Sequence, residues 1–276
     1  MNLNFGISTM VYYRKPIEKL LPYLIKEKIN IIELRPKKGH FNPQEISELL
    51  KLKKLLERKE ITVRAIHMPM DGADISHPQT YERIKSVREV EKAVLMAHHL
   101  GTDLVVVHPG TMVENPDDKG KRLELSIESL KEIVDFCQNW KVKIALENTL
   151  PGRVGDRWED IQLIKEAIPS KDLGICFDTG HYLLNYPEIE QGALNLYNIP
   201  INWQESILHI HIHDNDSKYD LHLLPQEGRF PWSSFIPFLR KINYEGVLIF
   251  EIKEQSNLDD CLKRVIVAID KIKNLI

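Results

Sequence analysis

The sequence predicts an α/β protein, and within that class a (β/α)₈ TIM barrel. Short apolar runs alternate with longer amphipathic segments, which is the pattern of parallel strands joined by crossover helices. Several runs are continuous in Val, Ile and Leu, as expected for strands that are covered on both faces. The length of 276 residues also suits a barrel, which commonly takes roughly 250 residues as one unit.

Eight apolar runs are candidate strands. They are residues 3–8, 30–35, 62–67, 103–108, 142–147, 173–178, 207–213 and 246–252. Between them lie helical patterns, for example over residues 43–60 and from Tyr81 to Gly101. Charged residues occupy the solvent face of the second pattern, and its glycine is a typical C-terminal stop. Because no linker rich in Pro, Gly or Ser interrupts the series, we expect a single domain over residues 1–276.

Composition excludes few classes of function. The chain is 43% hydrophobic and 28% charged, as is usual for a soluble globular protein. Its net charge of -3 shows no global basic bias toward nucleic acid, although a local basic rim stays compatible with it.

The cysteines and the N-terminus bear on the cellular compartment of the protein. Cys137, Cys176 and Cys261 are odd in number and lack CxxC spacing, so we expect reduced thiols. The N-terminus lacks the features of a signal peptide, and no apolar run approaches the ~18 residues of a membrane span. We therefore expect a cytoplasmic protein without membrane contact. The sequence leaves the oligomeric state open.

Histidine or carboxylate side chains stand at the ends of the last six candidate strands. In a barrel, these carboxyl ends face one mouth, where active sites lie. Imidazole and carboxylate groups that converge in an enclosed pocket are typical of a metal site. The residues are His67 in HMP, His108 in VVVHPG, Glu147 in IALENT, Asp178 and His181 in ICFDTGH, His211 in HIHIHDN and Glu251 in IFEI.

Each of these residues also has a structural interpretation. A carboxylate that ends an apolar strand needs a cation, and Arg64 or a similar base could pair with Glu147 or Glu251 instead of a metal. His181 could cap a helix or lie in a loop, and His67 and His108 could be structural histidines held extended by the prolines nearby.

The seventh candidate strand carries three histidines on one face, because strand side chains alternate. His209, His211 and His213 cannot all reach one ion, since alternate residues lie ~6.6 Å apart. We favour His211 as a ligand and expect His209 to be a hydrogen-bonded core residue. Downstream, Asp220 and His222 form a DxH pattern, which alone is weak and common in surface loops.

A basic segment from Arg35 to His40 follows the second candidate strand. It could receive a substrate phosphate or be a solvated loop. No glycine-rich phosphate loop follows the seventh or eighth strand, where the turns read NDSK from Asn215 and KEQSN from Lys253.

In this order, the motifs HMP, VVVHPG, ALENT, FDTGH, HxHDN, DxHxxxxxEG and FEI resemble the xylose isomerase-like TIM-barrel superfamily. It includes sugar-phosphate isomerases and epimerases and also endonuclease IV. The resemblance implies one divalent ion, Zn or Mn, held by Glu147, Asp178, His211 and Glu251. It further implies that Glu147 and Glu251 move a proton beside a carbonyl that the metal polarises, while His181 holds a substrate oxygen.

Endonuclease IV adds a second set of implications. Its site holds three zinc ions for phosphodiester cleavage, and DNA would then be the partner. All nine of its ligand positions carry a compatible residue here. They are His67, His108, Glu147, Asp178, His181, His211, Asp220, His222 and Glu251.

The N-terminal third is more similar to the isomerase members. The second candidate strand ends in IIELR, which directs Glu33 to where a sugar hydroxyl could bind, with Arg35 nearby as a further substrate contact. The sequence therefore favours a divalent-metal-dependent isomerase or epimerase acting on a sugar or sugar phosphate. The alternatives are an endonuclease IV-type zinc phosphodiesterase and a non-catalytic metal- or ligand-binding barrel.

Overall fold

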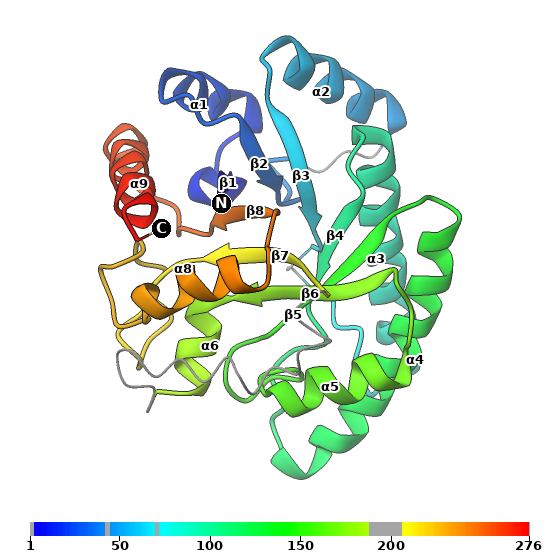
Figure 1. Cartoon of the computed structure of the whole chain (residues 1–276). Coiled ribbons are helices and arrows are strands. Elements are labelled where there is room, and N and C mark those ends of the chain that lie inside the picture. Colours follow the sequence, from blue (N-terminus) through cyan, green and yellow to red (C-terminus); the bar gives the residue numbers. More distant parts are fainter. Residues whose placement is uncertain (1–2, 42–44, 70–71, 188–205, 276) are drawn as a thin grey trace.

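The eight predicted strands are present and close into a parallel barrel (Figure 1). Each strand pairs with its successor in the chain, and β8 pairs with β1. The computed structural model describes residues 3–41, 45–69, 72–187 and 206–275. The strands are β1 (Asn4–Ser8), β2 (Ile31–Leu34), β3 (Thr62–His67), β4 (Leu104–Val107), β5 (Lys143–Glu147), β6 (Leu173–Asp178), β7 (Ile207–Ile212) and β8 (Val247–Phe250).

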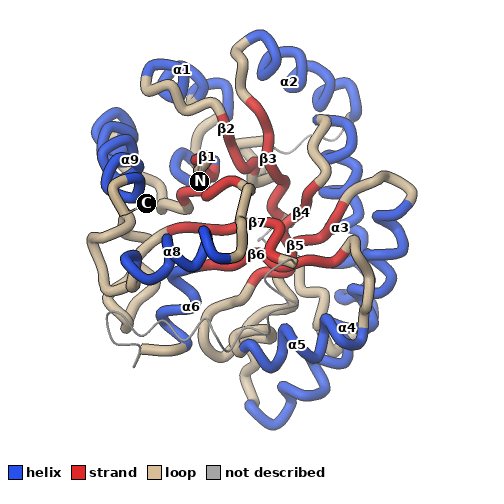
Figure 2. Tube along the Cα trace, in the orientation of Figure 1, coloured by secondary structure: helices blue, strands red, loops and turns tan. Residues whose placement is uncertain are grey.

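Helices surround the barrel on its outside (Figure 2). The α-helices are α1 (Leu21–Lys26), α2 (Ile46–Arg58), α3 (Thr80–Leu100), α4 (Lys119–Gln138), α5 (Trp158–Ala167), α6 (Thr179–Asn185), α8 (Trp232–Lys241) and α9 (Leu258–Lys273). Short 3₁₀ helices occupy η1 (Thr9–Tyr12), η2 (Ile17–Lys19) and η3 (Pro116–Asp118). None of the helices described here is long and apolar enough to cross a membrane.

Two predicted helix boundaries can be compared with the structure. The helix expected from residue 43 begins at Ile46, and residues 43 and 44 lie outside the described part of the chain. The helix expected from Tyr81 ends as predicted, because Gly101 caps α3 in the left-handed region at φ 84°. Glycine takes this conformation without a Cβ penalty.

The apolar core forms two separate layers. The larger layer lies between the strands and the helices, and the smaller one lies inside the barrel. The inner layer consists of Ala65, Leu104, Val106, Ala145 and Cys176. Because three of these side chains are small, the barrel has room for larger polar side chains between its strands.

The strand ends gather the polar residues at the same end of the barrel. Asp178 and His211 are direct partners across β6 and β7. His108, His213 and Glu251 come immediately after β4, β7 and β8 rather than within them, so these strands are slightly shorter than predicted. The backbone leaves the ladder at this level, and the side chains can therefore turn toward the barrel axis.

A substitution of Phe177, which faces outward from β6, can test the packing of the larger layer. Its ring stacks on Phe235 of α8 and Trp158 of α5, with ring centroids 5.5 and 5.9 Å apart. We expect Phe177→Ala to lower the free energy of unfolding by about 3–5 kcal/mol, because it leaves a cavity. Urea unfolding followed by circular dichroism measures this loss.

The matched control is Leu163→Ala on α5, whose side chain is 51% exposed. This change should stay within about 0.5 kcal/mol. Equal losses for the two variants would contradict the packing described for β6.

Candidate metal centre

The polar residues predicted from the sequence converge at the barrel mouth in three clusters, which are three of the five groups of possible ligands in the described part of the chain. The other two groups are Glu33 with His209 and His211, and Glu147 with Cys176 and His211. Within each cluster, the possible ligand atoms lie within 4.8 Å of one another. All nine residues predicted as metal ligands belong to these clusters, and His213 joins them. The first cluster is His67, His108 and Glu147; the second is Glu147, Asp178, His211 and Glu251; the third is His181, His213, Asp220 and His222.

Glu147 links the first two clusters. Its Oε2 lies 3.2 Å from Nε2 of His67 and 2.9 Å from Nε2 of His108. Its Oε1 lies 3.2 Å from Nδ1 of His211 and 3.4 Å from Nδ1 of His181. The side chain is fully buried. Each carboxylate oxygen therefore faces a different set of imidazoles.

Three histidines of the first and third clusters are oriented by the backbone. In each, Nδ1 donates to a carbonyl oxygen, so Nε2 is the nitrogen that can bind a metal when it carries no proton. The pairs are His67 with Met68 at 2.8 Å, His181 with Asn148 at 3.0 Å and His222 with Glu251 at 2.6 Å.

The start of α6 fixes His181. Asp178 caps this helix, and its Oδ1 accepts the backbone N–H of His181 at 2.7 Å. Asn148 clamps the neighbouring strand end, because its side chain accepts from the Asp178 N–H at 2.8 Å and donates to the Asp178 carbonyl at 3.0 Å. These two hydrogen bonds join the end of β6 to the residue that follows β5.

The three histidines of the seventh strand region lie at three levels. His209 is fully buried and binds Oε2 of Glu33 at 2.9 Å, which confirms that it is a hydrogen-bonded core residue. His211 binds the same oxygen at 2.7 Å and approaches Glu251 at 2.9 Å. His213 lies above them and approaches Asp178 at 2.9 Å.

The loop with Asp220 and His222 is built around Asp214. The buried Asp214 carboxylate accepts the backbone N–H groups of Gln226 and Phe230 and the indole N–H of Trp232, at 2.8–3.1 Å. Asp214 also forms an isolated β-bridge with Leu223. This fold-back sets Asp220 3.1 Å from Nε2 of His222. The DxH pattern is therefore part of an ordered loop that faces the mouth.

The cation beside Glu251 is Arg35 and not Arg64. Arg35 places Nη2 2.6 Å from Oε1 of Glu251. Arg64 instead binds Asp103 at 3.2 Å and the carbonyl of Leu208 at 3.1 Å. Arg64 itself therefore does not pair with a strand-end glutamate, because groups on β7 and before β4 hold its guanidinium. The alternative of a core ion pair with a similar base is confirmed for Glu251, which pairs with Arg35. Arg35 is also 6% exposed, so it does not belong to a solvated loop.

The buried carboxylates are ionised. Burial would raise the pKa of Glu147, but His108 and His211 lower it well below its usual value. Burial likewise opposes ionisation of Glu251, and Arg35 and His211 lower its pKa well below the usual value. The pKa of Glu33 is lowered against burial by His211 and His209. Ionised carboxylates are the form that binds a cation.

The histidines divide into two groups. Burial lowers the pKa of His108 and of His209 to about 4, against the opposing effect of Glu147 and Glu33 respectively. Burial also disfavours protonation of His181, but Asp178 and Glu147 raise its pKa to about 10. His108 and His209 are therefore neutral at pH 7 in the protein without metal, and His181 is cationic.

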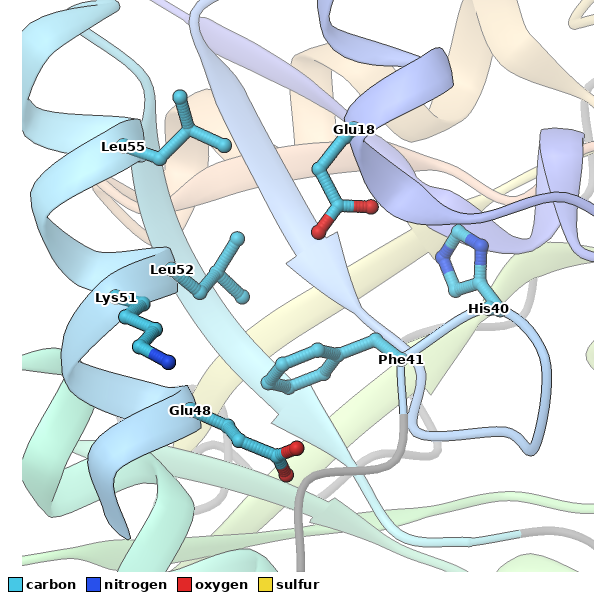
Figure 3. A pocket seen from close by; sticks show the side chains of 7 residues that line it. All are labelled: Glu18, His40, Phe41, Glu48, Lys51, Leu52 and Leu55. Carbon is cyan, nitrogen blue, oxygen red and sulfur yellow. The ribbon is translucent and has the colours of Figure 1, made fainter. Parts of the chain in front are cut away.

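A separate hollow of about 360 Å³ lies outside the barrel (Figure 3). Figure 3 shows side chains from η2, from the segment after β2 and from α2 around it. Its lining residues are Glu18, His40, Phe41, Glu48, Lys51, Leu52 and Leu55. Because none of them belongs to the three clusters, this hollow is distinct from the candidate metal centre.

Two residues of the site have roles that the sequence did not reveal. His213 shares its strand face with His211, so its alternation was a usable signal, but the sequence did not show that α6 and the loop would approach it. Asp214 stands out in the sequence only as part of the HDN motif. Its partners lie up to eighteen residues away, and a spacing pattern does not reveal them.

Comparisons with known proteins agree with this architecture. A family model described as "Xylose isomerase-like TIM barrel" matches residues 26–271. An uncharacterized protein of Methanocaldococcus jannaschii is 29% identical over 95% of this chain and 87% of its own length. A probable endonuclease 4 of Acholeplasma laidlawii is 27% identical over 65% of this chain and 62% of its own.

Solved structures share the fold. A D-tagatose 3-epimerase-like protein superposes with a TM-score of 0.84 at 24% identity, and 99% of each chain is covered. A protein named IOLI, crystallised with a zinc atom, superposes with a TM-score of 0.78 at 15% identity over 98% of each chain. At these identities, the likeness shows the fold alone.

Acid should destabilise the protein without metal. His108 and His209 have folded-state pKa values of about 4, below the 6.5 of an ordinary histidine. Between pH 6.5 and 4 the unfolded chain therefore binds protons that the native state does not. Stability is lost as the pH falls through this window, by about 1 kcal/mol per pH unit for each histidine.

Urea unfolding in the presence of a chelator, at several pH values, measures this slope. His209→Gln keeps a hydrogen-bond donor toward Glu33. It should lower the number of protons taken up on unfolding in this pH range by about one, and the slope should fall accordingly. A stability that is constant from pH 6.5 to 4.5 would contradict the neutral state assigned to these histidines.

Proposed function

Because the chain belongs to the xylose isomerase-like TIM barrel family, we propose that it is a metal-dependent enzyme with more than one divalent ion at the barrel mouth. We propose further that it hydrolyses a phosphodiester, which is the second of the functions that the sequence indicates. The observation that carries the proposal is the position of Glu147 between two ligand clusters.

A single-ion centre does not use Glu147 in this way. One oxygen of Glu147 faces His67 and His108, and the other faces His211 in the second cluster. A carboxylate with one oxygen toward each cluster is suited to bridge two cations. Paired ions are typical of enzymes that displace groups at phosphorus, because the ions stabilise both the attacking and the leaving oxygens.

The residues present fit divalent ions. Imidazole and carboxylate suit Zn, Mn, Co or Fe, and the backbone carbonyls around them orient the rings. Buried polar atoms without a hydrogen-bond partner in the described chain include Oδ1 of Asp220 and Nδ1 of His213. A buried polar group without a partner is costly, and a cation supplies one for each of these atoms.

In the mechanism, the residues of this chain hold the ions and position the substrate. His67 and His108 would hold one ion with Glu147, while Asp178, His211 and Glu251 would hold the other. When bound, divalent ions polarise a phosphoryl oxygen and lower the pKa of water. Arg35 keeps Glu251 ionised. The inner apolar layer packs among the strands below these ligands.

A sugar isomerase or epimerase is the second candidate, and the second cluster favours it. Glu147, Asp178, His211 and Glu251 alone form a complete one-ion site. Glu147 and Glu251 would then transfer the proton, and Glu33, Arg35 and His181 would contact the sugar.

The first test replaces Glu147, the carboxylate that faces both clusters. Glu147→Gln should lose at least one bound ion per chain and reduce hydrolysis of bis(p-nitrophenyl) phosphate or abasic-site DNA by about 100-fold or more. Elemental analysis and steady-state kinetics on zinc-loaded protein measure the two effects. Glu132→Gln, on the surface of α4 where Glu132 pairs with Arg88, is the matched control and should behave as the parent.

The substrates used in this test also identify the partner. Cleavage of abasic-site DNA together with the small diester would favour a nucleic-acid substrate, and cleavage of the diester alone a small one. A parent protein that binds two or more ions and hydrolyses neither substrate would overturn the proposed function.

A second test separates hydrolysis from proton transfer. Ketohexoses incubated with the metal-loaded protein in D₂O should gain no deuterium at the carbon next to the carbonyl, as observed by proton NMR. Exchange that requires both Glu147 and Glu251 would establish the epimerase instead. Tight metal binding with neither reaction would point to a binding barrel.

A further inference from the structure

We propose that His213 is a fourth protein ligand of the ion in the third cluster, together with His181, Asp220 and His222, and that this ion is structural. The inference rests on the proposed binding of metal at the mouth, and it concerns which ions the substrate can reach. A three-ligand site keeps an open position for substrate or water, whereas four protein ligands close a tetrahedral site.

Only one of the two ring nitrogens of His213 has a hydrogen-bond partner among the described residues. Nε2 lies 2.9 Å from Oδ1 and 3.1 Å from Oδ2 of Asp178. Nδ1 is buried and has no hydrogen-bond partner among the residues described. An imidazole that donates one N–H to a carboxylate carries a lone pair on its other nitrogen, as do most histidines that bind metals.

The other ligands surround this ring. His213 stacks on His222 with centroids 4.0 Å apart and planes 7° apart. His181 meets it edge-on at 5.6 Å. The possible ligand atoms of all four residues lie within 4.8 Å of one another. Three imidazoles and one carboxylate thus lie close enough to share one ion. To bind it, the stacked rings of His213 and His222 would turn until their in-plane lone pairs converge.

The backbone holds His213 in place. The hydroxyl of Thr179 donates to the His213 carbonyl at 2.7 Å and accepts the His213 N–H at 3.0 Å. At Gly180, a Cβ atom would lie 2.0 Å from Cε1 of His213. Only glycine at this position leaves space for the ring. The start of α6 and the end of β7 are thus shaped around this side chain.

Hydrogen bonds within the loop also position Asp220 and His222. The side-chain oxygen of Asn215 accepts the backbone N–H groups of Leu221 and His222 at 2.6 and 3.2 Å. His222 takes a left-handed conformation at φ 51°, which is uncommon for residues other than glycine, although histidine adopts it more often than most. An ion at this point would tie the loop to β7 and α6 and would offset the cost of that conformation.

If the site is closed, the ions of the centre would have different roles. The substrate would meet the ions joined by Glu147, whereas the ion beside His213 would carry no open position. A carboxylate and three imidazoles suit Zn²⁺, which prefers four such ligands in structural sites.

The experiment uses the full chain loaded with ZnCl₂. A crystal structure with anomalous data at the zinc edge should show an ion with a His213 nitrogen about 2.0–2.1 Å away. In solution, competition with a chromophoric chelator should show that His213→Phe, which keeps the stacked ring but lacks the nitrogens, binds the third zinc at least about tenfold more weakly. Asp220→Asn identifies which ion is the third.

Two outcomes would overturn the proposal. One is a filled third cluster whose ion lies more than about 3 Å from both nitrogens of His213 and has a water or open position as its fourth ligand. The other is a folded His213→Phe protein that binds all ions with parental affinity. If zinc occupies the closed site but no phosphodiester is cleaved, the inference stands and the proposed function fails.

Discussion

Four buried carboxylates at the barrel mouth set the conditions for the rest of the structure. Glu33, Glu147, Asp178 and Glu251 are at most 2% exposed. Charges removed from water this far require cations or several hydrogen bonds, and the chain supplies both. Arg35 and the histidines surround them in the metal-free protein, and divalent ions would take over part of this role. The small residues inside the barrel leave space for these groups, and the large ones outside it hold the strands.

The fold could be predicted from the sequence because its signals are local. Apolar runs that alternate with amphipathic segments specify parallel strands and helices, and barrel closure then follows from their number. The convergence of the nine ligand residues was also predictable, since the carboxyl ends of all strands face one mouth. The metal-binding role of these residues stays a prediction.

Contacts between distant segments could not be predicted in the same way. Arg35 rather than Arg64 pairs with Glu251, because the direction of a long side chain depends on the groups that surround it. The position of His213 depends on a glycine in α6, and the loop with Asp220 depends on the carboxylate of Asp214. Each of these contacts exists only after the barrel has closed. Spacing along the chain does not encode them.

The contact between Gly180 and His213 has a consequence for evolution. With no room for a methyl group between them, a larger residue at position 180 is tolerated only when position 213 becomes small. The two positions should therefore change together among relatives. A relative with this double change would keep the barrel and the residues around Glu147, yet its loop after β7 would have lost one contact. Such pairs would mark the branches of the family in which that loop became free to diverge.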